Sequence, residues 1–101
     1  MKPRVTVCLR ADGGFEILLN EAGRDLLVAE LQRLDERWDH FHLDHYADSE
    51  MEFATDVPLA AVPYRTDDRI LTTGKMILSS DAADRKYFPH VLSANERGED
   101  A

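Results

Sequence analysis

A glycine turn between two alternating segments determines how the chain begins to fold. Residues 4–10 and 15–19 each alternate apolar with other side chains, which is the pattern of a half-buried β-strand. Asp12-Gly13-Gly14 lies between them, and glycine adopts positive φ without steric cost. We therefore predict a β-hairpin formed by residues 3–10 and 15–19. The alternating apolar residues are Val5, Val7, Leu9, Phe15, Ile17 and Leu19.

The next segment, residues 21–36, changes to a helical period. Asn20 is a favourable N-cap residue, and Glu21 suits the positive end of a helix. Apolar side chains then recur at i, i+4, i+7 and i+11, which predicts one long helix with a buried stripe. The stripe consists of Leu27, Leu31, Leu34 and Trp38, so Trp38 is expected in the core.

Three later segments favour further strands. Residues 40–46 return to period two, with Phe41 and Leu43 on the expected core face. Residues 57–64 carry two prolines, so we expect an edge strand or an extended loop. Residues 69–79 form the last expected strand, in which Gly74 indicates a bulge.

The order of these elements defines the expected fold class. It is β-β-α-β-(β)-β, which favours an α+β, two-layer fold: a mainly antiparallel sheet of four to five strands with one long helix on a face. With 101 residues in the chain, we expect a single domain over residues 1–92 and a flexible tail over 93–101. The segment Tyr87-Phe88-Pro89 is expected to dock back on the body.

Charge and composition restrict the partners and the compartment. The net charge is −8, and residues 35–52 hold seven acids against one base, a local net of −6. Such a band repels phosphate backbones, so we expect no nucleic-acid ligand, whereas it favours a basic protein partner. No apolar run of about 18 residues indicates a membrane span, and no secretory signal is recognisable. With a single cysteine, these features favour the cytoplasm.

A histidine cluster is the one pattern that points to metal chemistry. His40-Phe41-His42-Leu43-Asp44-His45 has the spelling H-x-H-x-D-H, which resembles the metal-binding signature of the metallo-β-lactamase family. On a strand, His40, His42 and Asp44 share one face, and imidazole and carboxylate ligands suit Zn²⁺. The alternative is a solvated polar strand face, and both interpretations stay open at this point.

No arrangement of residues indicates nucleophilic catalysis. Cys8 alternates with the expected core residues of the hairpin, where a small packing role is usual. Ser79 and Ser80 follow a strand without the G-x-S-x-G pattern of a nucleophile elbow. A non-catalytic role is therefore favoured over an enzyme.

Acidic and apolar surfaces instead favour protein binding. The expected partner-binding residues are Asp48, Glu50, Glu52 and Tyr64, beside a proline-interrupted edge.

The centre of the chain also resembles a known family. Glu21-Ala22-Gly23, then Leu27, Leu31 and Leu34, then Asp39-His40-Phe41-His42-Leu43, is similar to the helix-then-strand centre of the immunity protein 32 family. That resemblance implies a small cytoplasmic α+β protein that neutralises a cognate bacterial toxin. A Trp/Gly-rich segment of that family is replaced here by residues 46–50.

Overall fold

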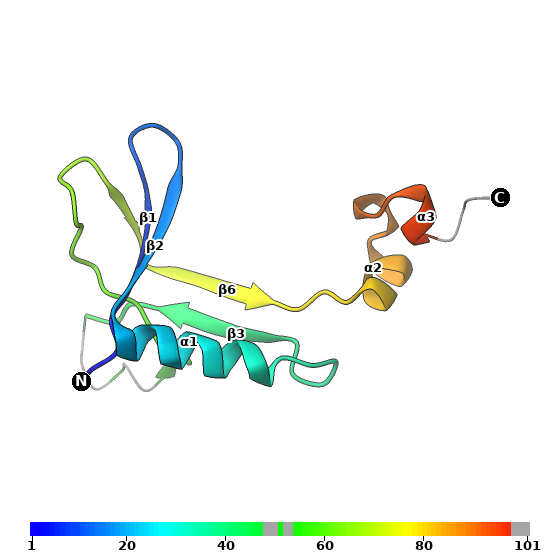
Figure 1. The fold of residues 1–101 in the computed structure, drawn as a ribbon, viewed down its shortest axis with the longest axis horizontal. Helices are drawn as coiled ribbons and strands as arrows, with labels where there is room; N and C mark the ends of the chain where they lie inside the picture. Colours follow the sequence, from blue (N-terminus) through cyan, green and yellow to red (C-terminus); the bar gives the residue numbers. More distant parts are fainter. Residues whose placement is uncertain (48–50, 52–53, 98–101) are drawn as a thin grey trace.

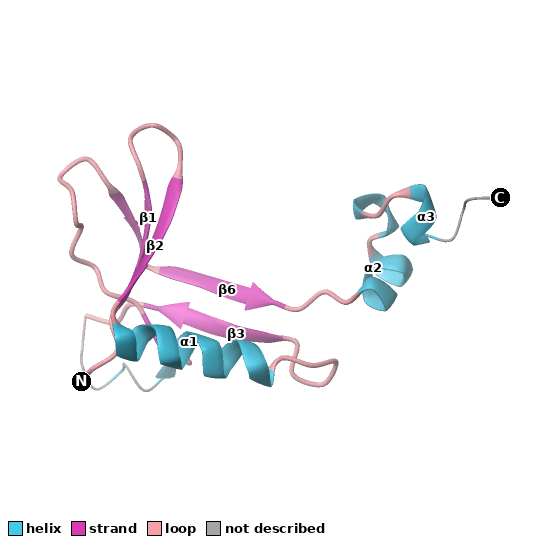
Figure 2. Ribbon diagram, viewed as in Figure 1, coloured by secondary structure: helices cyan, strands magenta, loops and turns pink. Residues whose placement is uncertain are grey.

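The fold was obtained as a computed structural model, which describes residues 1–47, 51 and 54–97. The predicted α+β class is confirmed. The structure contains helices and two small, mostly antiparallel sheets of three strands each (Figures 1 and 2). The strands are thus divided between two sheets instead of forming one. Among the helices described, none is both long enough and apolar enough to span a membrane.

The first sheet has the order β2-β1-β5 and contains the predicted hairpin. β1 (Val5–Leu9) pairs antiparallel with β2 (Phe15–Leu19) from Val5 opposite Leu19 to Leu9 opposite Phe15. Gly13 has φ 92° in the turn, a value that glycine tolerates. β5 (Arg69–Leu71) pairs antiparallel with the other edge of β1.

The second sheet has the order β4-β3-β6. β3 (His40–Asp44) lies in the centre, antiparallel to β6 (Thr73–Ile77) and parallel to β4 (Val57–Pro58). β4 is an edge strand, as the prolines of residues 57–64 predict.

Two junctions join the sheets into one folded body. β5 and β6 are separated by Thr72, whose carbonyl accepts from the His45 amide at 2.9 Å. Leu59 lies between the sheets, because its amide donates to the Asp44 carbonyl and it forms a parallel bridge with Val5. The predicted bulge at Gly74 is wrong: the strand breaks at Thr72, where it passes from one sheet to the other.

The helix α1 (Glu21–Arg33) covers the inner face of the second sheet. Asn20 caps it as predicted, since its Oδ1 accepts from the Gly23 amide at 2.7 Å. Its buried residues are Gly23, Leu27 and Glu30, so the predicted stripe is displaced: Leu31 is 43% exposed. A Cβ at Gly23 would collide with the Arg4 carbonyl, so this close approach sets the face that the helix buries.

The hydrophobic core lies where α1, β1, β3 and β4 meet. It includes the predicted pair Phe41 and Leu43, at 0% and 6% exposure. Its buried members are Val5, Leu27, Phe41, Leu43, Val57 and Leu59.

Both faces of β1 carry buried residues, whereas the sequence predicted burial of the Val5, Val7 and Leu9 face alone; on that face Val5 is buried as expected. Thr6 and Cys8 are 1% and 0% exposed, whereas Val7 is only partly buried. Residues 60–68 lie over the Thr6 and Cys8 face, because Thr6 shares a hollow with residues 60–64 and Cys8 contacts Asp68. No comparable segment among the described residues covers the apolar face of the hairpin.

The last part of the chain forms an arm that projects from the body (Figure 1). This C-terminal arm, residues 81–97, consists of α2 (Asp81–Tyr87), the short 3-10 helix η2 (Pro89–Val91) and α3 (Ala94–Arg97). The predicted docking of Tyr87-Phe88-Pro89 on the body is wrong, since Tyr87 is 64% exposed and α2 buries none of its residues. Within the predicted tail, residues 94–97 are helical.

Candidate protein-binding surface

A short loop after α1 presents Trp38 at the surface. The helix ends at Arg33, and the cap residue Leu34 is extended, with ψ 130°. The Oδ1 atom of Asp35 then accepts from the amides of Arg37 at 2.8 Å and Trp38 at 2.7 Å. The Asp35 amide donates back to the Trp38 carbonyl at 3.0 Å. Trp38 is therefore 47% exposed instead of buried on the helical stripe, and its backbone amide and carbonyl are each held by a hydrogen bond to Asp35.

The side chain of Trp38 is held within a row of planar groups. The Arg33 guanidinium lies 5.6 Å from the ring centroid of Trp38. The His40 ring stacks on Trp38 at 6.3 Å with an interplanar angle of 3°. His42 follows, with its ring 5.1 Å from His40 and perpendicular to it. We call these four residues, Arg33, Trp38, His40 and His42, the aromatic ladder.

Acidic groups border the aromatic ladder. Asp39 Oδ1 lies 2.7 Å from His40 Nδ1, and this hydrogen bond lowers the pKa of the Asp39 carboxyl below its ordinary value. Asp35 and Glu36 are exposed on the same loop. The ladder thus presents aromatic surface beside exposed carboxyl groups.

The predicted metal ligands do not converge as a set of three. His40 and His42 lie next to one another, but Asp44 is engaged elsewhere. Its Oδ1 accepts from the Thr73 hydroxyl at 2.7 Å and its Oδ2 from the Thr55 hydroxyl at 3.2 Å. Within the described ranges, the group whose three ligand atoms lie within 4.8 Å of one another is a different one, Cys8, Glu16 and Asp68.

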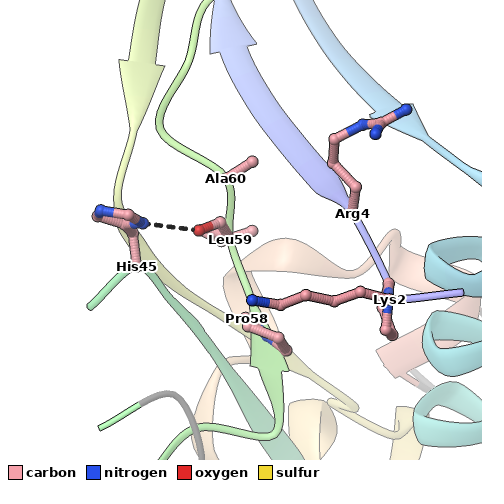
Figure 3. A pocket seen from close by; sticks show the side chains of 7 residues that line it. Lys2, Arg4, His45, Pro58, Leu59 and Ala60 are labelled. Atoms are coloured by element: carbon pink, nitrogen blue, oxygen red, sulfur yellow. Dashed lines mark hydrogen bonds between the residues drawn. The ribbon is translucent and has the colours of Figure 1, made fainter. Parts of the chain in front are cut away.

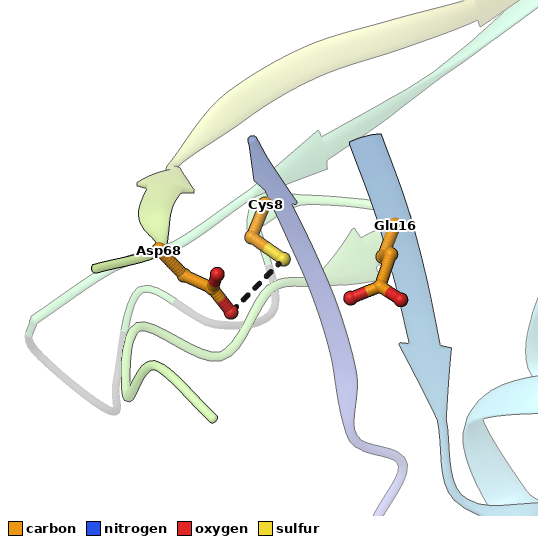
Figure 4. Close-up of side chains that lie close together, drawn as sticks. All are labelled: Cys8, Glu16 and Asp68. Carbon is orange, nitrogen blue, oxygen red and sulfur yellow. Dashed lines mark hydrogen bonds between the residues drawn. The ribbon is translucent and has the colours of Figure 1, made fainter. Parts of the chain in front are cut away.

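That group lies on the hairpin sheet (Figure 4). Cys8 Sγ is 3.7 Å from Asp68 Oδ2, and Arg65 pairs with both carboxylates. The hydrogen bond that Arg65 Nε donates to Asp68 Oδ1, at 3.3 Å, lowers the pKa of that carboxyl and raises the pKa of the guanidinium. Arg10 lies 3.9 Å from Glu16 as well, so two guanidiniums face the two acids, and the arrangement is an ion-pair network that ties residues 65–68 to β1 and β2. No local pattern predicts this network, because its members lie up to 60 positions apart in the chain.

A basic hollow of about 270 Å³ lies near the start of the chain (Figure 3). Lys2, Arg4 and His45 line it together with Pro58, Leu59 and Ala60. His45 Nδ1 is 2.9 Å from the Leu59 carbonyl, so this histidine is held by the junction between the sheets. Among the residues described here, the hollow brings no nucleophile next to a base.

Of the four predicted partner-binding residues, only Tyr64 lies in the described part of the chain. Tyr64 is 50% exposed in the segment that covers β1. Asp48, Glu50 and Glu52 lie outside the described residues. Trp38 is the surface residue that the sequence reasoning missed. The signal available for it was Asp35, three positions earlier, which is the spacing of an Asp side chain that caps a turn.

Comparison with known proteins adds no relative: no family model, curated protein or solved structure matches the chain.

Proposed function

We propose that this chain is a non-catalytic protein-binding domain whose aromatic ladder captures a basic protein partner. The observation that carries the proposal is Trp38, a half-exposed indole whose backbone and ring are both held in place. Buried aromatic anchors supply most of the energy of a typical interface. An anchor that is already ordered loses little conformational entropy on binding.

Charge supports a basic partner over an acidic one. The segment of net charge −6, residues 35–52, includes Trp38, His40 and His42 of the ladder, and the hydrogen bond to His40 lowers the pKa of the Asp39 carboxyl. Opposite charge raises the association rate and suppresses partners of the same sign. A lysine or arginine side chain of the partner would contact the exposed part of Trp38 and pair with Asp39 or Glu36.

The finer proposal is neutralisation of a toxin in the cytoplasm. It rests on the resemblance to immunity proteins and on the acidic charge. A basic nuclease is the class of toxin that an acidic binding surface fits best.

The test uses the immobilised full chain as bait for an extract of the source cells. The wild type and a control variant, Val62→Ala, are expected to retain a basic protein at low salt and release it at high salt. Val62 is 76% exposed on the segment that covers β1, away from the ladder. Trp38→Ala is expected to lower retention at least about tenfold. Equal retention by Trp38→Ala, or an acidic captured protein, would contradict the proposal.

Metal binding by His40, His42 and Asp44 stays the alternative. The adjacency of the two imidazoles, at 5.1 Å between ring centroids, is the observation in its favour. Titration of the untagged chain with Zn²⁺ is expected to shift the NMR signals of both ladder histidines if the alternative holds. Unchanged histidine signals would contradict metal binding at this site. So would a His40 signal that shifts equally on addition of Zn²⁺ in the wild type and in a His42→Gln variant.

A further inference from the structure

The apolar face of the hairpin sheet is open. An open hollow of about 230 Å³ lies on it, bounded by β1, β2, β5 and β6. We call this hollow the hairpin groove. Phe15 is 70% exposed and Ile17 39% exposed at its wall. The groove is continuous with the core, since Leu43 and Leu59 also line it. Its other apolar walls come from Val7, Leu71 and Met76.

This openness reverses the usual arrangement of an antiparallel sheet. Such a sheet normally packs its apolar face and leaves its polar face in water. Here Thr6 and Cys8 are buried on one face of β1, whereas Phe15 and Ile17 face solvent on the other side of the sheet. An exposed apolar patch of this kind marks a contact with another molecule.

The C-terminal arm carries the second uncovered apolar surface. Tyr87, Phe88 and Val91 are 64%, 50% and 58% exposed, whereas Leu92 is 7% exposed inside the arm. The arm is therefore a small folded unit with apolar side chains on its outside. Its three acids and three bases over residues 81–97 give it no net charge, so docking on a chain of net charge −8 meets no extra repulsion.

The arm follows the C-terminal end of β6, whereas β1 and β2, which carry Phe15 and Ile17 at the groove, lie near the other end of β6 (Figure 1). Hydrogen bonds restrain the connection between β6 and the arm, residues 78–80. The Leu78 amide donates to the Asp39 carbonyl at 2.6 Å, and Ser80 caps α2 through the Ala83 amide at 3.1 Å. Ser79 also bonds to Asp84. The arm is thus directed away from its own groove.

The excess surface matches what a stable dimer buries. The accessible surface is 7327 Å², whereas a compact chain of 11.5 kDa exposes about 5,800 Å². The radius of gyration is 16.8 Å, against about 13 Å for a compact chain of this length. Burying the excess of about 1,500 Å² on each of two chains would give about 3,000 Å², within the range of obligate homodimers.

We propose that the chain forms a twofold dimer in which the C-terminal arm of each copy occupies the hairpin groove of the other. The two arm–groove contacts are equivalent, so the interface is closed and uses both uncovered surfaces. This dimer does not rest on the basic partner proposed for the aromatic ladder, although Tyr87 of the arm lines a hollow together with Glu36 and Asp39, which border the ladder.

The test begins with the oligomeric state of the full chain, measured by sedimentation over a concentration series. A species of twice 11.5 kDa is expected. Phe88→Glu in the arm and Phe15→Glu in the groove should each weaken the dimer at least about tenfold. The control Val62→Glu, on the segment covering the opposite face, should leave it unchanged. A monomer at every concentration would overturn the proposal, whether its arm is extended or folded onto its own groove.

Mixing the variants separates this dimer from any other. Phe88→Glu retains a groove and Phe15→Glu retains an arm, so their mixture regains one of the two contacts. The mixed dimer is expected to be at least about tenfold tighter than either variant alone. No gain on mixing would overturn the proposal. If Phe15→Glu loses its circular dichroism spectrum, Ile17→Glu replaces it, and the arm variant, which lies outside the body, still tests the contact.

Discussion

The two sheets of this protein each have three strands, but they differ in whether another element packs on their apolar face. The β4-β3-β6 sheet has α1 across its inner face, and Phe41 there is 0% exposed. The β2-β1-β5 sheet has its apolar face open, and Phe15 there is 70% exposed. Alternating sequence is therefore enough to form a strand, whereas burial depends on what the rest of the chain places above it. One long helix covers only one of two sheets.

Truncation of the two phenylalanines should show the largest contrast. Phe41→Ala is expected to lower the free energy of unfolding by about 3–5 kcal/mol, because it leaves a cavity in the core. Phe15→Ala should cost less than about 1 kcal/mol at protein concentrations where the chain is monomeric, since that ring is mostly in water. Urea unfolding of both variants measures the difference. Equal losses would mean that the hairpin face is covered within the monomer.

Two glycines offer the next contrast. Gly23→Ala should cost about 2 kcal/mol, because its Cβ would collide with the Arg4 carbonyl where α1 meets β1. Gly74→Ala should be neutral or stabilise by about 0.5 kcal/mol, since its Cβ would meet nothing within 4 Å. The same unfolding experiment compares them. A stable Gly23→Ala variant would show that α1 can move away from β1.

The two helix caps compare the body with the arm. Asn20 Oδ1 accepts from the amides of Gly23 and Arg4, so Asn20→Ala should cost about 1–2 kcal/mol of global stability. Ser80 caps α2, which packs little against the body, so Ser80→Ala should leave the unfolding midpoint of the monomeric body nearly unchanged. Amide exchange in α2 should nevertheless rise. A loss of body stability in Ser80→Ala would indicate that the arm supports the fold.

The smallest contrast is electrostatic and compares Asp39 with Asp68. Both carboxyls have a pKa below the ordinary 3.8, through His40 and Arg65 respectively. Each contributes stability fully above that ordinary value and loses it as pH falls through the lowered pKa. Carboxyl NMR titration of His40→Gln should move the Asp39 pKa upward and leave that of Asp68 in place. A shift at both would show that the two networks are coupled.

Much of the fold followed from local patterns in the sequence. The hairpin, the helix start at Asn20 and the inward pair Phe41 and Leu43 depend on periods of two or 3.6 residues and on a cap. The break at Thr72 and the burial of Cys8 did not follow, since both depend on segments distant in sequence. Tertiary contacts of this kind override local propensity.

The candidate surface was predictable only in part. The adjacency of His40 and His42 follows from the strand period, but the fate of Asp44 depends on the hydroxyls of Thr55 and Thr73. Trp38 was misplaced because the helical stripe continues in the sequence after the helix itself has ended at Arg33. The backbone turn at Asp35, not the apolar spacing, decides where that ring lies.

The junction at Thr72 has a consequence for how the chain acquires its structure. One continuous segment supplies β5 to the first sheet and β6 to the second, and Arg69 pairs with Leu9, 60 positions earlier. Neither sheet can complete its pairing until this late segment has been synthesised. Long-range pairing of this kind makes folding slow and couples distant parts in a single cooperative unit. During synthesis, the edge of β1 that pairs with β5 therefore stays unpaired until most of the chain has left the ribosome.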